Sequence, residues 1–319
     1  MTACGLKGDV ASSFPQFNKV DRNSMLGVAI LMVIVYHLFC WVQNPIGTFY
    51  IGYTGVDIFL FFSGMGLTRS FKNRSVGDFY ARRLKKVYPL FLVTIVMVVL
   101  YQYTVRMPGV HANPLVELAM QVSTAYYYVR PAQGLDWYLN SLFLLYALFP
   151  LLHKFCVRYG FKVYVYLLLI VTLVYLCFQF AGPTIHWKHD CLLGRLPIFA
   201  LGIICAYNEF STRAKWIFSL VLLLLYYPLK ELSPYLAGSV LMPFFMMCLA
   251  YAFGRTKKSR VLDYLGIHTL ELYCAQLLAW FPVVACSDVC MRYVLFFTIQ
   301  IFGSAFFIVL NKYIQRRIG

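Results

Sequence analysis

The sequence predicts an all-α fold, namely a polytopic membrane bundle of about ten transmembrane helices. Composition is the first reason: of 319 residues, 61% are hydrophobic and 13% are charged, and the mean hydropathy is +0.70. An average soluble domain is roughly 45–50% apolar and about 25% charged, and a soluble chain of this size does not bury so much apolar surface in one core. This composition excludes soluble globular, disordered and fibrous proteins.

The second reason is the length of the apolar runs. A transmembrane helix needs about 20 mostly apolar residues, with roughly 17–25 tolerated. Ten runs approach this length, although the seventh is short and the ninth carries polar residues. They cover residues 25–42, 53–68, 89–105, 137–153, 163–181, 192–207, 216–229, 236–253, 262–285 and 293–313. The longest loop covers only residues 106–136, so we expect one membrane domain over residues 20–313 between tails at 1–19 and 314–319.

The third reason is the placement of the basic residues. Cytoplasmic loops of membrane proteins are rich in Lys and Arg, and an amino-terminus inside the cell puts most of the 28 Lys and Arg residues in the inner loops. Ten helices then place both termini in the cytoplasm. Orientation in the membrane explains the net charge of +16, so nucleic acid is not an expected partner. The first twenty residues are polar, which predicts a retained first helix and no cleaved signal peptide.

Ionisable residues inside the apolar runs are the first functional candidates, because a charge at mid-bilayer costs roughly 2.5–3.5 kcal/mol. His37 closes an almost purely apolar helix, about 18 Å from the inner face. Asp57 is expected at about 24 Å, within roughly one helical turn of that depth. Its carboxylate could orient the imidazole of His37 as an acid orients a base; alternatively, it only bridges helices. The other members of this set are Arg195, His268 and Glu271.

A dense basic segment precedes the third helix. Arg82, Arg83, Lys85 and Lys86 lie close together and are followed by Tyr88. Such a segment can serve orientation and bind anionic lipid headgroups. Alternatively it binds a phosphorylated cofactor, since Arg makes bidentate contacts with phosphate and Lys adds a point charge.

Aromatic and hydrogen-bonding residues stand together on the expected outer side, in Asp136-Trp137-Tyr138 and in residues 186–190. Carbohydrate sites combine such groups, and so do the aromatic belts at membrane interfaces. His186 and His189 have no third ligand at metal-binding spacing, so no metal is expected.

Three sequence blocks follow one another in a recognisable order. They are residues 27–37, which end in His37, residues 55–64, which contain Asp57 and Ser63, and residues 79–89, which contain Arg82-Arg83-Leu-Lys85-Lys86-Val-Tyr88. In this order the blocks resemble the membrane acyltransferase-3 family, and later blocks around Trp137, Arg195 and Tyr273 extend the resemblance over about residues 20–313.

The resemblance implies an enzyme that O-acylates cell-surface glycans with an acyl donor, usually acetyl-CoA, taken from the cytoplasm. It also implies that His37 is catalytic and that Arg83-Leu-Lys-Lys86 stands at the donor-associated Arg-x-x-Arg motif of the family.

Two positions depart from the family pattern. Leu26 stands where an arginine is common, with Arg22 one turn earlier. The closing Tyr-Leu-x-His pattern reads Tyr273-Cys-Ala-Gln276 here, so the second histidine is replaced by glutamine.

We therefore expect an O-acyltransferase of the plasma membrane that moves an acetyl or other acyl group from acyl-CoA to a glycan hydroxyl, without a metal. His37, oriented by Asp57, would deprotonate the hydroxyl or carry the acyl group covalently. Ser63 or backbone amides would stabilise the oxyanion. The expected donor-binding residues are Arg82, Arg83, Lys85, Lys86, Tyr88 and Ser63. The expected acceptor-binding residues are Asp136, Trp137, Arg195 and Glu271.

Two alternatives stay open. A proton-coupled transporter or lipid flippase also uses intramembrane His and Asp, although the sequence lacks paired interrupted helices in matching halves and a Walker-type loop. An acyltransferase that acts on a lipid or small-molecule acceptor is the other alternative.

Overall fold

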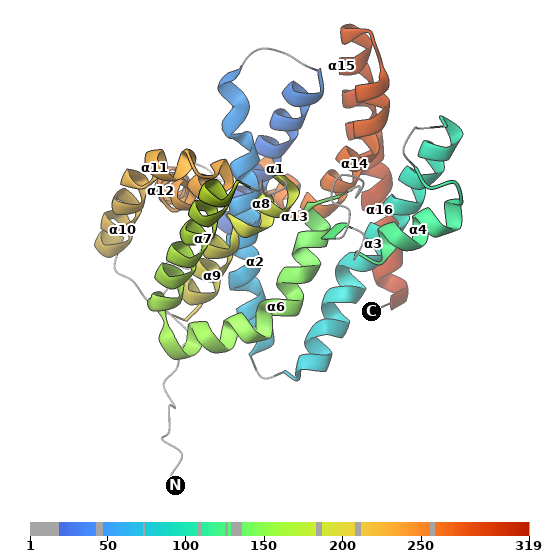
Figure 1. Ribbon diagram of the computed structural model, residues 1–319. Coiled ribbons are helices and arrows are strands. Elements are labelled where there is room, and N and C mark those ends of the chain that lie inside the picture. The colour runs from blue at the N-terminus through green and yellow to red at the C-terminus, as the bar shows by residue number, and fades with distance from the viewer. Residues whose placement is uncertain are drawn as a thin grey trace.

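The computed structural model describes residues 19–42, 47–72, 74–106, 110–124, 127–128, 136–182, 187–207, 212–255 and 259–318. Within these ranges the chain is built from helices and contains no strand (Figure 1). The predicted all-α class is confirmed. The predicted tail over residues 1–19, apart from Lys19, lies outside the described residues, and so does His186.

Within the described ranges, seven helices are long and apolar enough to cross a membrane. Six of them are single helices that correspond to predicted runs. They are α1 (Lys19–Val42), α2 (Gly55–Phe71), α3 (Val76–Thr104), α6 (Tyr138–Tyr159), α7 (Phe161–Ala181) and α12 (Pro234–Arg255). The seventh is the long rod at the right of Figure 1, formed by α15 (Val289–Thr298), the π-helical turn η2 (Ile299–Gly303) and α16 (Ser304–Ile318).

The ninth predicted run is broken into two helices. It consists of α13 (Arg260–Ile267) and α14 (Thr269–Ala285), which meet at an angle of 71°. The cause is the packing of α13 on α1: an ideal Cβ on Gly266 would lie 1.8 Å from the carbonyl oxygen of Asn23, and one on Gly27 would lie 2.1 Å from that of Leu262. Only glycine permits so close an approach. This close packing fixes the direction of α13 along α1, and α14 runs in a different direction.

The sixth and seventh predicted runs also form helices, but short ones. They contain α8 (Trp187–Leu193), α9 (Leu196–Cys205), α10 (Thr212–Leu224) and α11 (Tyr226–Lys230). At 1.5 Å per residue, α9 is about 15 Å long, half the thickness of a bilayer core. By length and composition the described residues therefore hold seven spans, or eight if the bent pair is one span, where the sequence predicts ten. A further helix, α4 (Pro114–Val122), lies within the loop predicted over residues 106–136.

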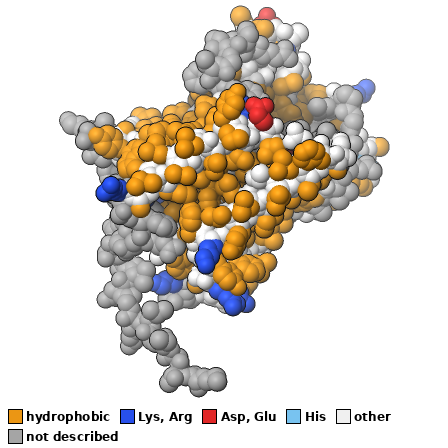
Figure 2. All heavy atoms as spheres, turned by 60° about the vertical axis from the view of Figure 1, so that its left-hand side comes forward, with side chains coloured by type: hydrophobic (Ala, Val, Ile, Leu, Met, Phe, Trp, Pro, Cys, Tyr) orange, Lys and Arg blue, Asp and Glu red, His pale blue; other side chains and the backbone are white. Residues whose placement is uncertain are grey.

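The protein buries its centre and exposes apolar side chains around it. Every residue of α9 from Pro197 to Cys205 is buried, and an ideal Cβ on Gly202 would lie 2.1 Å from the carbonyl oxygen of Phe61 in α2. Phe180 and Leu224 are 86% and 78% exposed, and apolar side chains cover most of one face of the molecule (Figure 2). Large exposed apolar faces of this kind mark contact with lipid or a partner, as a membrane protein requires.

Helices α1 and α2 run in opposite directions, with the 3₁₀ helix η1 (Gly47–Thr54) leading into α2. Gly55 lies against Ala29, and Gly52 lies against Met32. We call the end of the bundle where α2 passes into α3 the basic end. The last helix also finishes there, because the Nζ of Lys85 donates to the carbonyl oxygen of Ile318 at 3.4 Å. We call the opposite end, where α1 finishes, the histidine end.

Candidate functional site

His37 faces a cavity of about 200 Å³ near the histidine end. We call this space the histidine cavity. Its walls come from α1, η1, α2, α8, α12, α14, the turn between α8 and α9, and the residues before α6. Besides His37 its lining includes Trp41, Trp137, Arg195, Gln276 and Trp280. The cavity thus combines a titratable ring with several aromatic faces and an amide.

The ring of His37 is held by stacking. It lies parallel to the ring of Trp41, one turn further along α1, with 4.7 Å between the centroids. Its Nδ1 is buried and has no hydrogen-bond partner among the described residues. The carboxamide of Gln276 lies close enough to interact with the imidazole, although neither of its polar atoms makes a well-aligned hydrogen bond to a described residue. One nitrogen of His37 is therefore available to a substrate.

Asp57 does not contact His37. Gly55 packs on Ala29 and Val33, and Gly52 packs on Met32 and Tyr36. Asp57 therefore lies roughly eight residues, or about 12 Å along α1, from the level of His37. The two depths do not agree within one helical turn, because η1 extends the second helical segment beyond the predicted start at residue 53, which places Asp57 deeper in the bundle. The predicted orientation of His37 by Asp57 finds no support in the structure.

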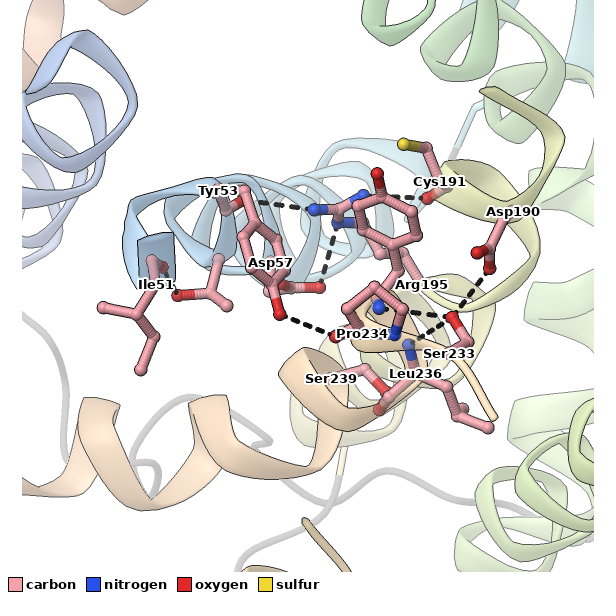
Figure 3. Close-up of polar contacts among 12 residues, drawn as sticks. Ile51, Tyr53, Asp57, Asp190, Cys191, Arg195, Ser233, Pro234, Leu236 and Ser239 are labelled. Atoms are coloured by element: carbon pink, nitrogen blue, oxygen red, sulfur yellow. Dashed lines mark hydrogen bonds and ion pairs between the residues drawn. The ribbon is translucent and has the colours of Figure 1, made fainter. Parts of the chain in front are cut away.

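Arg195 is the charged partner of Asp57, as Figure 3 shows. Their side chains are fully buried, with 3.3 Å between Nε and Oδ1. The other guanidinium nitrogens donate to the carbonyl oxygens of Cys191 and Tyr53, both at 3.1 Å. The guanidinium also lies 4.7 Å from the centroid of the Tyr235 ring and 5.0 Å from that of Trp137. Three of its five N–H bonds are thus directed at protein acceptors, and this ion pair ties α2 to the start of α9.

The carboxylate of Asp136, another predicted acceptor-binding residue, is hydrogen-bonded to other groups of the chain. Its carboxylate accepts from the backbone N–H groups of Tyr138 (3.0 Å) and Leu139 (2.8 Å), which caps α6. It also accepts from the hydroxyl of Tyr273. Asp136 lines the histidine cavity together with Trp137 and Arg195, and its hydrogen bond positions Tyr273 in the cavity wall.

Glu271 lies elsewhere, at the start of α14. Its Oε1 accepts from Nδ2 of Asn311 at 2.7 Å and lies 3.6 Å from Nδ1 of His268. It lines neither the histidine cavity nor the second cavity described next. The structure therefore does not bring Glu271 together with the other predicted acceptor-binding residues.

A second cavity, of about 350 Å³, lies toward the basic end. We call it the basic cavity, because Arg22, Arg83 and Lys86 are in its lining and no carboxylate is among the described lining residues. Ser63 of α2 is also in its wall. Lys86 is exposed and Arg83 partly exposed, so solvent reaches these cations.

The basic segment of α3 is divided between two faces. Arg83 and Lys86 line the basic cavity, whereas Arg82, Lys85 and Tyr88 do not. Arg82 and Lys85 are exposed. The hydroxyl of Tyr88 donates to the carbonyl oxygen of Val122 at 3.3 Å, which joins α3 to α4. Of the four predicted donor-binding cations, the structure brings two to the cavity.

The two cavities adjoin one another. Val33, Val56 and Tyr273 line both of them, so these three side chains stand between the cations and the histidine. Along α1, His37 lies fifteen residues beyond Arg22, which is about 22 Å of helix. A long, thin substrate anchored on the cations could therefore present its far end to His37.

Sequence reasoning missed two contributors. Gln276 was noticed only as a departure from a family pattern, although an amide in an apolar run is itself a signal of function. Tyr273 was part of a motif, but only the fold shows that its ring stands between two cavities.

Among the described residues no group of three or more His, Cys, Asp or Glu side chains is arranged to hold a metal ion.

Inside a bundle of apolar helices, the described residues form a cavity with His37 that adjoins a cationic cavity, and this arrangement is that of a membrane protein with a buried site. A family model described as an acyltransferase domain, that of the acyltransferase-3 family, matches residues 25–311. The chain belongs to this family, and the protein is a membrane acyltransferase. No curated protein and no solved structure matches the chain significantly.

Proposed function

We propose that the protein takes an acyl group, in the simplest case acetyl, from cytoplasmic acyl-CoA and transfers it to a hydroxyl group of a cell-surface glycan. The observation that carries this proposal is the pair of adjoining cavities, one with Arg83 and Lys86 and the other with His37. The donor supplies a phosphorylated end and a reactive end, and the two cavities match these in chemistry and in order.

The nucleotide of CoA is assigned to the basic cavity. Arg22 and Arg83 offer planar guanidinium groups to phosphate, and Lys86 adds a point charge. Arg22 lies in the same wall as Leu26, so it supplies from one turn earlier the cation that the family commonly carries at position 26. Ser63 faces this cavity and not the histidine cavity, so its role is contact with the donor and not with the oxyanion.

The thioester arm passes Val33, Val56 and Tyr273 to reach His37. There the hydroxyl oxygen of the acceptor attacks the thioester carbonyl carbon, a C–O bond forms, and the C–S bond breaks. His37 takes the hydroxyl proton and returns it to the thiolate, so that an ester and free CoA result. General base catalysis of this kind contributes roughly 10²–10⁴-fold in rate.

The acceptor is assigned to the aromatic side of the histidine cavity. Trp41, Trp137 and Trp280 line it, and aromatic faces stack well on the apolar faces of sugar rings. Arg195 also lines it, but its guanidinium is occupied by Asp57 and two carbonyl oxygens. Arg195 therefore supports the wall, and the aromatic rings are the surface that a glycan would contact.

The test is replacement of His37 by alanine. Purified wild-type protein in detergent should release CoA from acetyl-CoA in the presence of an acceptor glycan, and His37→Ala should lose at least roughly 10²-fold of that rate. Chromatographic quantitation of CoA avoids thiol reagents, which the ten cysteines would consume. His111→Ala is the matched control, because His111 is exposed and lines neither cavity.

Three outcomes would contradict the proposal. Full activity of His37→Ala would remove the histidine from the reaction. Consumption of acetyl-CoA with lipid acceptors but with no glycan would assign a different acceptor. Movement of a solute across liposomes, without any use of acyl-CoA, would favour a transporter.

A further inference from the structure

Gln276 of α14 is a buried polar side chain of the histidine cavity, and the mechanism above does not use it. It is 1% exposed, and neither its Oε1 nor its Nε2 has a hydrogen-bond partner among the described residues. A buried polar group without a partner costs about 1–3 kcal/mol. A glutamine that carries this cost while it lines a cavity is placed to bind something that enters the cavity.

Its position along α14 matches the path assigned to the donor. Tyr273 lines both cavities, whereas Gln276 and Trp280 line only the histidine cavity. Residues three and four apart share one face of a helix, so a thioester that passes Tyr273 meets Gln276 about one turn further on. The imidazole of His37 lies beside that amide.

The other strong donor in the cavity, Arg195, already directs three of its five N–H bonds at protein acceptors. All three nitrogens of the Arg195 guanidinium have partners: Nε faces Asp57, and the two terminal nitrogens donate to the carbonyl oxygens of Cys191 and Tyr53. The two N–H bonds of Gln276 have no acceptor in the described part of the chain, and its side chain carries no charge. An uncharged donor gains most when negative charge develops on its acceptor, which is the property required to stabilise a transition state.

We propose that Gln276 is a catalytic residue of the acyl transfer, and that its Nε2 donates a hydrogen bond to the acyl carbonyl oxygen. This inference rests on the proposed function. When the acceptor oxygen attacks the carbonyl carbon, the electron pair of the C=O bond moves to that oxygen, and the N–H of Gln276 stabilises the charge. Collapse of the intermediate restores the C=O bond and expels the thiolate, which takes the proton held by His37. Gln276 itself neither gains nor loses a proton.

The decisive variant is Gln276→Met, because methionine has nearly the same length and lacks an N–H donor. Loss of one oxyanion donor lowers kcat by about 10²–10³-fold, and the KM for acetyl-CoA should stay close to wild type because the nucleotide binds elsewhere. The thermal unfolding midpoint should stay unchanged or rise, since the substitution removes an unpartnered buried amide. Gln276→Glu should be at least as slow, because a carboxylate repels the oxyanion.

Leu278→Met is the matched control. It introduces the same side chain two positions further along α14, where Leu278 lines neither cavity and carries no polar atom. It should retain wild-type kcat within about threefold, as volume-conserving swaps usually cost less than about 1.5 kcal/mol.

Three results would overturn the inference. The first is wild-type kcat in Gln276→Met. The second is a loss of kcat that comes with a displaced pH–rate profile, because Gln276 would then act by positioning His37. The third is a loss that follows a lower unfolding midpoint, which would make the role structural. If His37→Ala is inactive while Gln276→Met is active, only this inference fails; if wild-type protein never consumes acetyl-CoA, the proposed function fails with it.

Discussion

At the residue scale, the intramembrane base His37 and the intramembrane acid Asp57 have separate roles. His37 lines a cavity and keeps Nδ1 unpartnered, whereas Asp57 is fully buried against Arg195. A buried ion pair is tolerated when further hydrogen bonds satisfy its polar atoms. Arg195 meets that condition through the carbonyl oxygens of Cys191 and Tyr53, whereas the carboxylate of Asp57 has no hydrogen-bond partner besides Arg195 among the described residues. The pair therefore holds the fold around the histidine cavity.

A double-mutant cycle on this pair measures that role. Asp57→Leu leaves a buried guanidinium without its counter-ion, and Arg195→Met leaves a buried carboxylate, so each single change should destabilise the protein by about 3–5 kcal/mol. The double variant should lose much less than the sum, because neither charge then remains alone. Thermal unfolding of the purified proteins gives the comparison, and strictly additive losses would show that the two side chains are not coupled.

The sequence indicates single residues better than it indicates their partners. His37 stands out because a lone imidazole in an apolar run is costly to insert, and the structure places it in a cavity wall. The partner of Asp57 could not be found in the same way. Depth along one helix depends on where that helix begins, and η1 moves this beginning from residue 53 to Gly47. Arg195 is far away in sequence, and only tertiary packing brings it to Asp57.

At the element scale, α3 shows how a helix divides a charge cluster. The sequence presents Arg82, Arg83, Lys85 and Lys86 as one patch. Residues three apart share a face of a helix, so Arg83 and Lys86 face the basic cavity together while Arg82 and Lys85 stay exposed. Spacing predicts these two pairs, but only packing decides which pair faces inward.

This division gives a matched experiment. Arg83→Ala/Lys86→Ala should weaken CoA binding by about tenfold or more per contact, since a hydrogen bond to a charged group is worth about 1.5–3 kcal/mol. Arg82→Ala/Lys85→Ala removes the same charge and should change the affinity little. Equilibrium binding of CoA to purified protein, measured at two salt concentrations, separates a direct contact from a screened long-range effect. Equal losses in both double variants would contradict the assignment.

Helix existence was predictable at this scale, whereas helix continuity was not. All ten apolar runs are helical in their described parts, because apolar composition over such lengths favours helices in lipid. The break between α13 and α14 has no proline at the bend. It follows from the contacts of Gly266 and Gly27 with neighbouring backbone, and a hydropathy profile carries no information about such contacts.

At the scale of the whole molecule, the two cavities lie toward opposite ends of the bundle. We therefore expect the donor to enter at one end and the acceptor at the other. The cations of the basic cavity lie at the end where α2 passes into α3, and α16 finishes beside Lys85 at that same end. The aromatic lining of the histidine cavity lies toward the other end. A cytoplasmic basic end, as the Lys and Arg distribution favours, gives acyl-CoA direct access to its cavity.

The number of membrane crossings depends on α9 and α10, which are too short to count as spans by length. Contacts nevertheless place the two ends of the α9 segment at opposite ends of α2. Arg195 pairs with Asp57 near the start of α2. Beyond α9, the hydroxyl of Tyr207 hydrogen-bonds to His153, whose ring packs on Phe71 at the other end of α2. From Asp57 to Phe71 the helix rises about 21 Å, so α9 and its flanking turns follow most of the length of a span.

The chain must then return before α12, since the hydroxyl of Tyr53, which precedes α2, donates to the carbonyl oxygen of Pro234 at 2.8 Å. We therefore predict ten crossings, with α9 and α10 as the short sixth and seventh. A topology reporter inserted after residue 207 should lie on the same face as one inserted after residue 72, and a reporter after residue 232 should lie on the opposite face. Eight crossings would put the reporters at 207 and 232 on one face, opposite to the reporter at 72, and would contradict this prediction. Either count leaves the two ends of the membrane domain on the same side, so only the reporter after residue 207 decides whether a half-length helix, buried against α2, crosses the bilayer.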